Sequence, residues 1–400
     1  MELVEKIFLY SLNVNLPRAS PVLRAAVSRE PVYRVLIILA LWKDTTDWPA
    51  YEYQNRDDVT IPRILRPLDY HSPLDEDERG ELQRSVLRCK WCTFDRILEQ
   101  LPDLMRLAIQ RIWVNTTVDM DGEQQTALNR FLAGEKNHRV FTGISGGVHG
   151  LHFTLSISPL VSVALNFGDV NTLEHRIASF KEFPANILRG EQGFGDKESA
   201  FVEYLRIASG FNRAIVLGME RPAISRDALQ QGIRKALLEK NTEALISLLK
   251  IDEFNVRSGT PGNAPYTLPS EHFRTAVRVA ENDPTIFQIL LRASAESVPG
   301  EDSEITEWAM DLQSPLGDWV LDLMTNLPQL VESARDRRGS IFFLGAANRE
   351  SEMARRYLGE VIGVAELPGW MEEKSFDVSS LWMQDSDSDS NSDSDAEDLG

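Results

Sequence analysis

The sequence predicts a mainly α-helical protein whose second half is a stacked array of helix pairs. Four segments of that half share one pattern, in which a polar turn joins two runs of apolar residues at helical spacing. They are 236–249, 276–291, 308–324 and 344–358. Successive equivalent positions lie 42, 33 and 34 residues apart, taken at Leu248, Leu290, Leu323 and Tyr357. Because one short helix pair cannot bury its apolar stripe alone, this period indicates pairs stacked into one core.

A period near 33 residues is that of the ankyrin repeat, and the array resembles a degenerate form of that family. Two weaker units are expected upstream, at 158–169 and 201–211, so the predicted array covers residues 151–365. The family's T-P-L-H signature is absent, and Ser158-Pro-Leu160 is its nearest counterpart. Another kind of helix-pair repeat therefore remains an alternative. In either case the resemblance implies a scaffold that binds another macromolecule and carries out no chemistry.

An insert rich in glycine and proline, residues 255–270, explains the 42-residue step. Insertions in repeat proteins lie on one face, which is often the binding face. We therefore expect this loop to be a contact element.

The first 28 residues predict two short helices separated by a loop at 13–17, with Pro21 in the first position of the second helix. This segment resembles the start of an F-box, in the divergent form common in filamentous fungi. The family's E-L-x-x-x-I-x-x-Y-L stretch is matched, one place late at its end, by Glu2, Leu3, Ile7, Tyr10 and Leu12. The Leu-Pro pair that precedes this stretch in the family is absent.

The F-box resemblance implies docking to the small adaptor of cullin-based ubiquitin ligases. The residues expected to make that contact are Leu3, Ile7, Phe8 and Leu16. The alternative is an amphipathic hairpin that only caps the domain behind it, because an apolar stripe at helical spacing usually faces a core.

The rest of the first half is expected to be helical with irregular loops. An apolar helix at 31–41 completes the F-box-like segment, which covers residues 1–42. The connecting region, residues 43–150, contains helices at 81–92 and 94–113, and Pro102 marks a junction inside the second of these.

The charge balance and the cysteine content restrict the partners and the compartment. The chain has 42 basic and 61 acidic residues and a net charge of −19, whereas proteins that bind nucleic acid usually carry a basic patch. Two cysteines cannot form the disulfide framework of a secreted protein. The strongest apolar run, residues 35–42, is far shorter than the roughly twenty residues that a membrane-spanning helix needs. We expect protein partners, no nucleic acid, no membrane, and a cytoplasmic or nuclear location.

The predicted C-terminal domain, residues 366–400, is a disordered acidic tail rich in serine and aspartate. Four serines have an acidic residue three positions later, as acidophilic kinases of the casein-kinase type prefer. They are Ser386, Ser390, Ser392 and Ser394. Each phosphate would add about −1.5 to −2 charges. The alternative is a solubilising tail that no protein recognises.

Two motifs suggest chemistry but lack the residues that it needs. Cys89 and Cys92 have C-x-x-C spacing, but there is no second cysteine pair to complete a zinc site, and buried thiols on a helix are expected. The sequence 143–147 spells the G-x-S-x-G of a hydrolase elbow, which requires a strand before Ser145 and a helix after it. Gly150 interrupts such a helix, and His272 is the only late histidine.

The sequence thus predicts a non-enzymatic interaction adaptor with no cofactor, no metal and no catalytic residue. The specific hypothesis is the substrate-recruiting subunit of a cullin-based ubiquitin ligase. The alternatives are a repeat scaffold without a ligase link and a serine hydrolase that uses Ser145.

Overall fold

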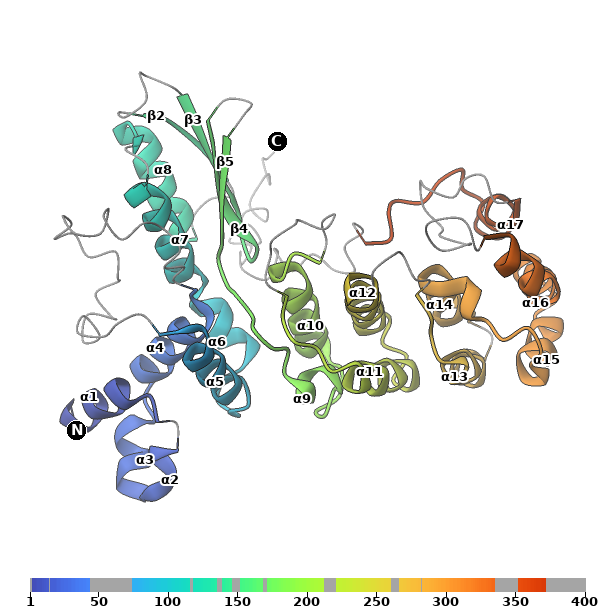
Figure 1. The fold of residues 1–400 in the computed structure, drawn as a ribbon, viewed down its shortest axis with the longest axis horizontal. Coiled ribbons are helices and arrows are strands. Elements are labelled where there is room, and N and C mark those ends of the chain that lie inside the picture. Colours follow the sequence, from blue (N-terminus) through green and yellow to red (C-terminus); the bar gives the residue numbers. More distant parts are fainter. Residues whose placement is uncertain are drawn as a thin grey trace, which may run out of the picture. The chain divides into compact units, whose positions relative to one another are not determined.

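The computed structural model confirms a mainly α-helical protein (Figure 1). It describes residues 2–13, 15–43, 74–115, 118–134, 139–145, 152–167, 171–211, 221–259, 266–281, 283–334 and 352–371. The chain divides into two compact units, one formed by residues 1–100 with 178–376 and the other containing residues 101–177. Within the described ranges, no helix combines the length and the apolar character needed to cross a membrane.

The first unit begins with four helices. They are α1 (Glu2–Ser11), α2 (Leu16–Ala19), α3 (Pro21–Val27) and α4 (Glu30–Leu41). Pro21 occupies the first position of α3, as predicted, and the Ser20 hydroxyl caps that helix by accepting a hydrogen bond from the Val22 amide. Most of α4 is buried, so the apolar helix predicted at 31–41 forms the centre of this region.

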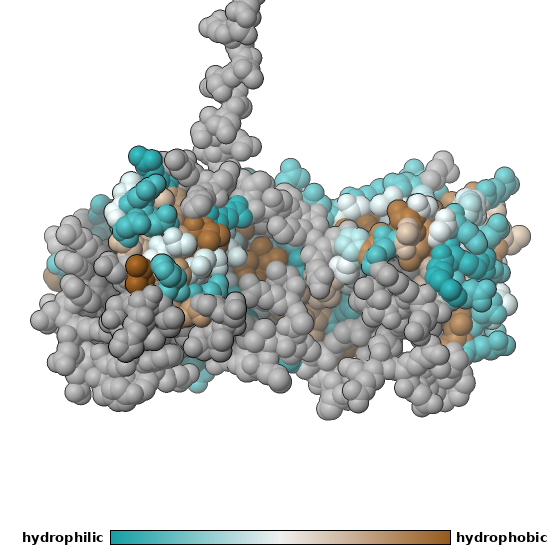
Figure 2. All heavy atoms as spheres, turned by 90° about the horizontal axis from the view of Figure 1, so that it is seen from above, coloured by the Kyte–Doolittle hydropathy of each residue, from teal (hydrophilic) through white to brown (hydrophobic). Residues whose placement is uncertain are grey.

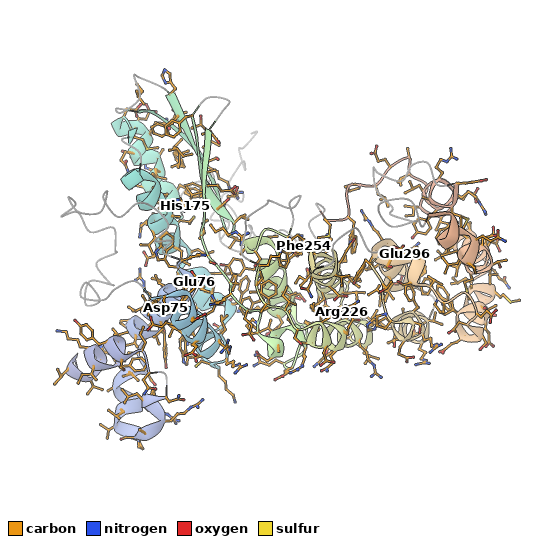
Figure 3. The ribbon with its side chains drawn as sticks, viewed as in Figure 1. Asp75, Glu76, His175, Arg226, Phe254 and Glu296 are labelled. Atoms are coloured by element: carbon orange, nitrogen blue, oxygen red, sulfur yellow. The ribbon has the colours of Figure 1, made fainter. Side chains whose placement is uncertain are left out.

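Two further helices, α5 (Glu76–Leu87) and α6 (Phe94–Glu99), follow. The predicted helix at 81–92 begins earlier because Asp75 and Glu78 form a capping box at its start (Asp75 is labelled in Figure 3). It also ends earlier, at Leu87, so Cys89 and Cys92 lie in the turn after it and not on a helix. The buried Gln83 amide donates to the carbonyl oxygens of Ala40 (2.9 Å) and Ser179 (2.7 Å). These bonds attach a stretch from much later in the sequence to α4 and α5.

The predicted array is present as stacked helix pairs (Figure 1). The pairs are α9 (Ala185–Leu188) with α10 (Asp196–Ala208), α11 (Arg226–Leu238) with α12 (Thr242–Gly259), α13 (Ser270–Ala280) with α14 (Thr285–Ser294), and α15 (Ser303–Asp311) with α16 (Pro315–Ala334). One row consists of α9, α11, α13 and α15, and α10, α12 and α14 pack in sequence beside it. After α16, α17 (Glu352–Arg356) and the π-helix Tyr357–Ile362 follow, and the π-helix packs on α16.

The equivalent positions of the predicted repeat all lie in the core. Leu248, Leu290, Leu323 and Tyr357 are buried. Seen from above, the surface at the end of the array that carries α15 to α17 is mostly hydrophilic with small hydrophobic patches (Figure 2). The apolar stripes of these helices are therefore used in packing pairs against each other.

Two glycines allow very close contact between helices of the array. A Cβ atom on Gly232 of α11 would lie 1.8 Å from the carbonyl oxygen of Leu188 in α9. A Cβ on Gly317 of α16 would lie 2.2 Å from the carbonyl oxygen of Ala309 in α15. Both distances are far inside van der Waals contact, so the two approaches require glycine.

The second unit is an antiparallel sheet with helices on one side (Figure 1). Its elements are α7 (Leu101–Asn115), β1 (Val118–Asp119), α8 (Gly122–Leu132), β2 (Val140–Ser145), β3 (His152–Ser158), β4 (Ser162–Phe167) and β5 (Asn171–Arg176). The strands pair in sequence order, with Leu155 opposite Leu165 and Ile157 opposite Val163. α7 packs on β4 and β5, and α8 packs on β2, so these buried side chains form the core of the unit.

The structure contradicts three sequence predictions. The weak repeat at 158–169 is wrong, because residues 158–167 form the turn and second strand of the β3–β4 hairpin, and the array begins at α9. The connecting region at 43–150 is not purely helical, since it contains β1 and β2. The loop predicted at 255–270 begins later than expected, because α12 continues to Gly259. The second weak unit, 201–211, does belong to the array as part of α10.

Candidate functional site

A fully buried ion pair lies on α10, in the row of α10, α12 and α14. The Arg206 guanidinium donates two hydrogen bonds of 2.7 Å to the two carboxylate oxygens of Glu203. The Ser247 hydroxyl of α12 donates to the same carboxylate at 2.8 Å. Neither charged side chain has more than 2% of its surface exposed. Such a pair is stable only when its geometry satisfies both partners, as this bidentate contact does.

The chain returns to this row after the π-helix. Residues 363–371, here called the return segment, have no helix or strand and run back from α17 past α14 (the orange-red trace in Figure 1). Arg292 of α14 donates to the Pro368 carbonyl oxygen at 2.9 Å, and Arg206 donates to that of Met371 at 3.2 Å. The array thus binds an extended piece of polypeptide through its main-chain carbonyl groups.

Trp370 anchors the return segment. Its side chain is 2% exposed, whereas Val364, Glu366 and Pro368 of the same segment are exposed. The Lys250 ammonium lies 4.9 Å from the centre of the indole ring, and the Arg292 guanidinium lies 5.5 Å from it. Both distances are within the range of cation–π attraction, which is strongest for tryptophan. We call the place formed by Lys250, Arg292 and Arg206 the Trp370 socket.

A second buried polar network fixes the neighbouring loop. The Asp252 carboxylate accepts hydrogen bonds from the Tyr266 hydroxyl (2.9 Å) and the Gln230 amide (2.7 Å), and it pairs with Arg226 at 3.3 Å. Figure 3 labels Arg226, which comes from the start of α11. Burial raises the pKa of Asp252, although Arg226 acts in the opposite direction. The described end of the predicted contact loop therefore packs inward through Tyr266, while residues 260–265 lie outside the described ranges.

The buried His272 contacts the same network through Gln230. Its Nε2 lies 2.6 Å from the Gln230 carbonyl oxygen, which can only accept a proton, so Nε2 carries the hydrogen. Burial, and secondly the nearby Arg234, lower the pKa of His272 from its ordinary value of 6.5 to about 4. In its folded state the protein thus holds this imidazole in the uncharged form at neutral pH.

We expect His272 to make the folded state less stable as the pH falls. Between pH 6.5 and about pH 4 the unfolded chain binds a proton that the folded chain does not, so stability is complete above pH 6.5 and is lost below it. Wild type should lose about 1 kcal/mol more than His272→Gln between pH 7 and pH 5.5, measured by urea unfolding. Comparison with the variant cancels the opposite contribution of Asp252. Equal losses in the two proteins would contradict the expectation.

The residues predicted to bind the ligase adaptor are divided between surface and core. Leu3 (70% exposed) and Ile7 (53%) lie one turn apart on α1, and Tyr10 continues the same exposed face. Phe8 is buried in the packing of the hairpin, and Leu16 is half-buried. The structure therefore brings Leu3 and Ile7 together on an accessible apolar face and directs Phe8 to the interior.

The two cysteines lack the surroundings of reactive thiols. Burial raises the pKa of the Cys89 thiol and raises that of Cys92 to about 12, so both are protonated at neutral pH. Reactive cysteines show the opposite shift. Among the residues that the structure describes, no three ligand side chains form a group that could hold a metal ion.

Ser145 does not lie at a strand-to-helix elbow. It ends strand β2, where it pairs with Val118 of β1, and the next element described is strand β3. A nucleophile elbow needs a helix in that place. His272, the late histidine of the hydrolase alternative, is buried and bonded to Gln230.

The four predicted phosphorylation sites, Ser386, Ser390, Ser392 and Ser394, lie outside the described residues. The predicted tail begins too early, however, because residues 366–371 belong to the return segment and Trp370 is in the core.

No protein-family model, curated protein or solved structure matches the chain.

Proposed function

We propose that the protein is an interaction adaptor of the cytosol or nucleus, and that its helical array binds an extended peptide of the protein it recruits. One observation carries the proposal: the row of α10, α12 and α14 holds the return segment by two main-chain carbonyl groups and one buried indole. Carbonyl contacts suit many peptide sequences, and a single buried aromatic anchor supplies most of the affinity in many interfaces. This is the chemistry of peptide recognition.

We further propose that α1 links the array to a cullin-based ubiquitin ligase through the small adaptor of that complex. The support is the F-box resemblance of residues 1–28, together with the exposed apolar face of Leu3 and Ile7. Large apolar side chains at adjacent turns of a surface helix are costly to expose unless a partner covers them. A scaffold with no ligase link is the alternative.

Leu3→Asp/Ile7→Asp is expected to abolish recovery of the ligase adaptor in a pull-down with the full-length protein. Two carboxylates would have to lose water at a contact that is otherwise apolar. Both positions are exposed in the free protein, so thermal unfolding should change little.

Leu238→Asp is the matched control, because Leu238 is an exposed leucine of α11 (57% exposed) and does not belong to the α1 face. This variant should recover the adaptor as wild type does. Equal recovery by the α1 double variant would eliminate the ligase link and leave the scaffold alternative.

A further inference from the structure

We infer that the Trp370 socket is a binding site for a tryptophan-containing extended peptide of a partner, and that the chain's own return segment occupies it as a tethered competitor. The inference rests on the proposed function, and it adds the chemical class of the client and a means of controlling access. A partner with this chemistry would displace residues 366–371 and take the position of Trp370.

The first support is the kind of contact. The two arginines bind main-chain carbonyl oxygens, which every peptide has, and one side chain alone supplies the specificity. Both the Lys250 ammonium and the Arg292 guanidinium lie over the indole ring, and tryptophan is the natural side chain with the strongest attraction for cations. A ligand for this site therefore needs tryptophan with carbonyl acceptors on both sides.

The second support is the exposure of most of the return segment apart from Trp370. Val364, Ala365, Glu366 and Pro368 are exposed, and the segment forms neither helix nor strand. Segments with few buried contacts open at low free-energy cost compared with the core that they cover. The return segment can leave the socket while the helix pairs beneath it remain folded.

The third support is the state of the socket itself. Lys250 and Arg206 are both fully buried. Lysine and arginine are rarely fully buried unless they have a partner. An empty socket would lose the contacts that Lys250 and Arg292 make with the indole ring, so the array favours an occupant of the same chemistry.

Tethering makes the return segment an effective competitor. A segment on a short connection is present at an effective concentration of about millimolar, so a free peptide of the same sequence must compete against it. The apparent affinity of wild type for such a peptide is the intrinsic affinity of the open socket multiplied by the fraction of time that the socket is open.

The test measures binding of a fluorescent peptide with the sequence of residues 364–373, Val-Ala-Glu-Leu-Pro-Gly-Trp-Met-Glu-Glu, to full-length proteins. Trp370→Ala removes the internal anchor, and we expect it to bind the peptide at least about tenfold more tightly than wild type does. A peptide with alanine in place of its tryptophan should bind to neither protein. Trp370→Ala/Arg292→Met should bind the peptide at least about tenfold more weakly than Trp370→Ala does. This variant lacks the guanidinium that donates to a main-chain carbonyl oxygen and contacts the indole.

Trp370→Phe keeps an aromatic ring in the socket and replaces Trp370→Ala in the binding test if the alanine variant unfolds. It should bind the peptide several-fold more tightly than wild type, because phenylalanine competes less well for the two cations. Two results would overturn the inference: a folded Trp370→Ala protein that binds no peptide, or wild type that binds it as tightly as the variant. Recovery of the ligase adaptor by Trp370→Ala, measured in parallel, reports on the ligase proposal separately.

Discussion

Replacing Arg206 with methionine is expected to lower the free energy of unfolding by about 3–5 kcal/mol. Methionine replaces the aliphatic part of the arginine side chain, and the substitution removes the positive charge beside Glu203. That carboxylate is almost fully buried and, among the described residues, would keep the Ser247 hydroxyl as its hydrogen-bond partner. A buried charge without its counter-ion is among the most destabilising changes a single substitution can produce.

The double variant Glu203→Leu/Arg206→Met separates charge from packing. It removes both charges and keeps apolar volume, and buried ion pairs replaced in this way are often as stable as the original. We expect most of the lost stability to return, measured by urea unfolding at pH 7. A single variant that costs less than about 1 kcal/mol would contradict this account of the α10–α12 contact.

Gly232→Ala is expected to cost about 3 kcal/mol or more, at or beyond the upper end of the usual range for overpacking. The new methyl group would meet the Leu188 carbonyl oxygen, which is backbone and cannot rotate away. Either α9 must move away from α11, or the local hydrogen bonds of α9 must break. Thermal unfolding of the purified variant measures the loss.

Gly359→Ala is the control for that substitution. Gly359 lies in the π-helix, and apart from its own helix backbone no described atom lies within 4 Å of where its Cβ would be. The control should change the stability by no more than about 0.5 kcal/mol, the usual size of a surface effect. If both variants unfolded alike, the close approach of α9 and α11 would not be the cause.

The array could be predicted from the sequence because its signal is local. A polar turn between runs of apolar residues recurs at a nearly constant interval, and Leu248, Leu290 and Leu323 are buried as that pattern requires. The sequence predicts a weak repeat where the second half of the hairpin 152–167 lies. Phe153, Leu155 and Ile157 nevertheless alternate with polar residues, as in a half-buried strand. The proline and leucine that follow resembled a repeat signature, and they occupy the hairpin turn.

The socket could not be predicted, because its residues are far apart in the sequence. Arg206, Lys250, Arg292 and Trp370 come from three helices and the return segment, and no spacing connects them. The boundary between the return segment and the tail could not be predicted either, because the acidic composition after residue 371 made the whole of 366–400 resemble a disordered tail. Trp370, which follows Pro368 and Gly369, was a local sign that this part of the chain packs against the array.

The return segment also changes how the array is expected to come apart. Stacked repeats that touch only their neighbours can fray from either end, since the terminal pair is held on one side. Here the chain beyond α17 contacts α10, α12 and α14, which belong to the three pairs that precede α15 and α16. Melting of the last pair is therefore coupled to the middle of the stack through the indole anchor. Release of that anchor would restore independent fraying, so occupancy of one small site sets the cooperativity of the whole row.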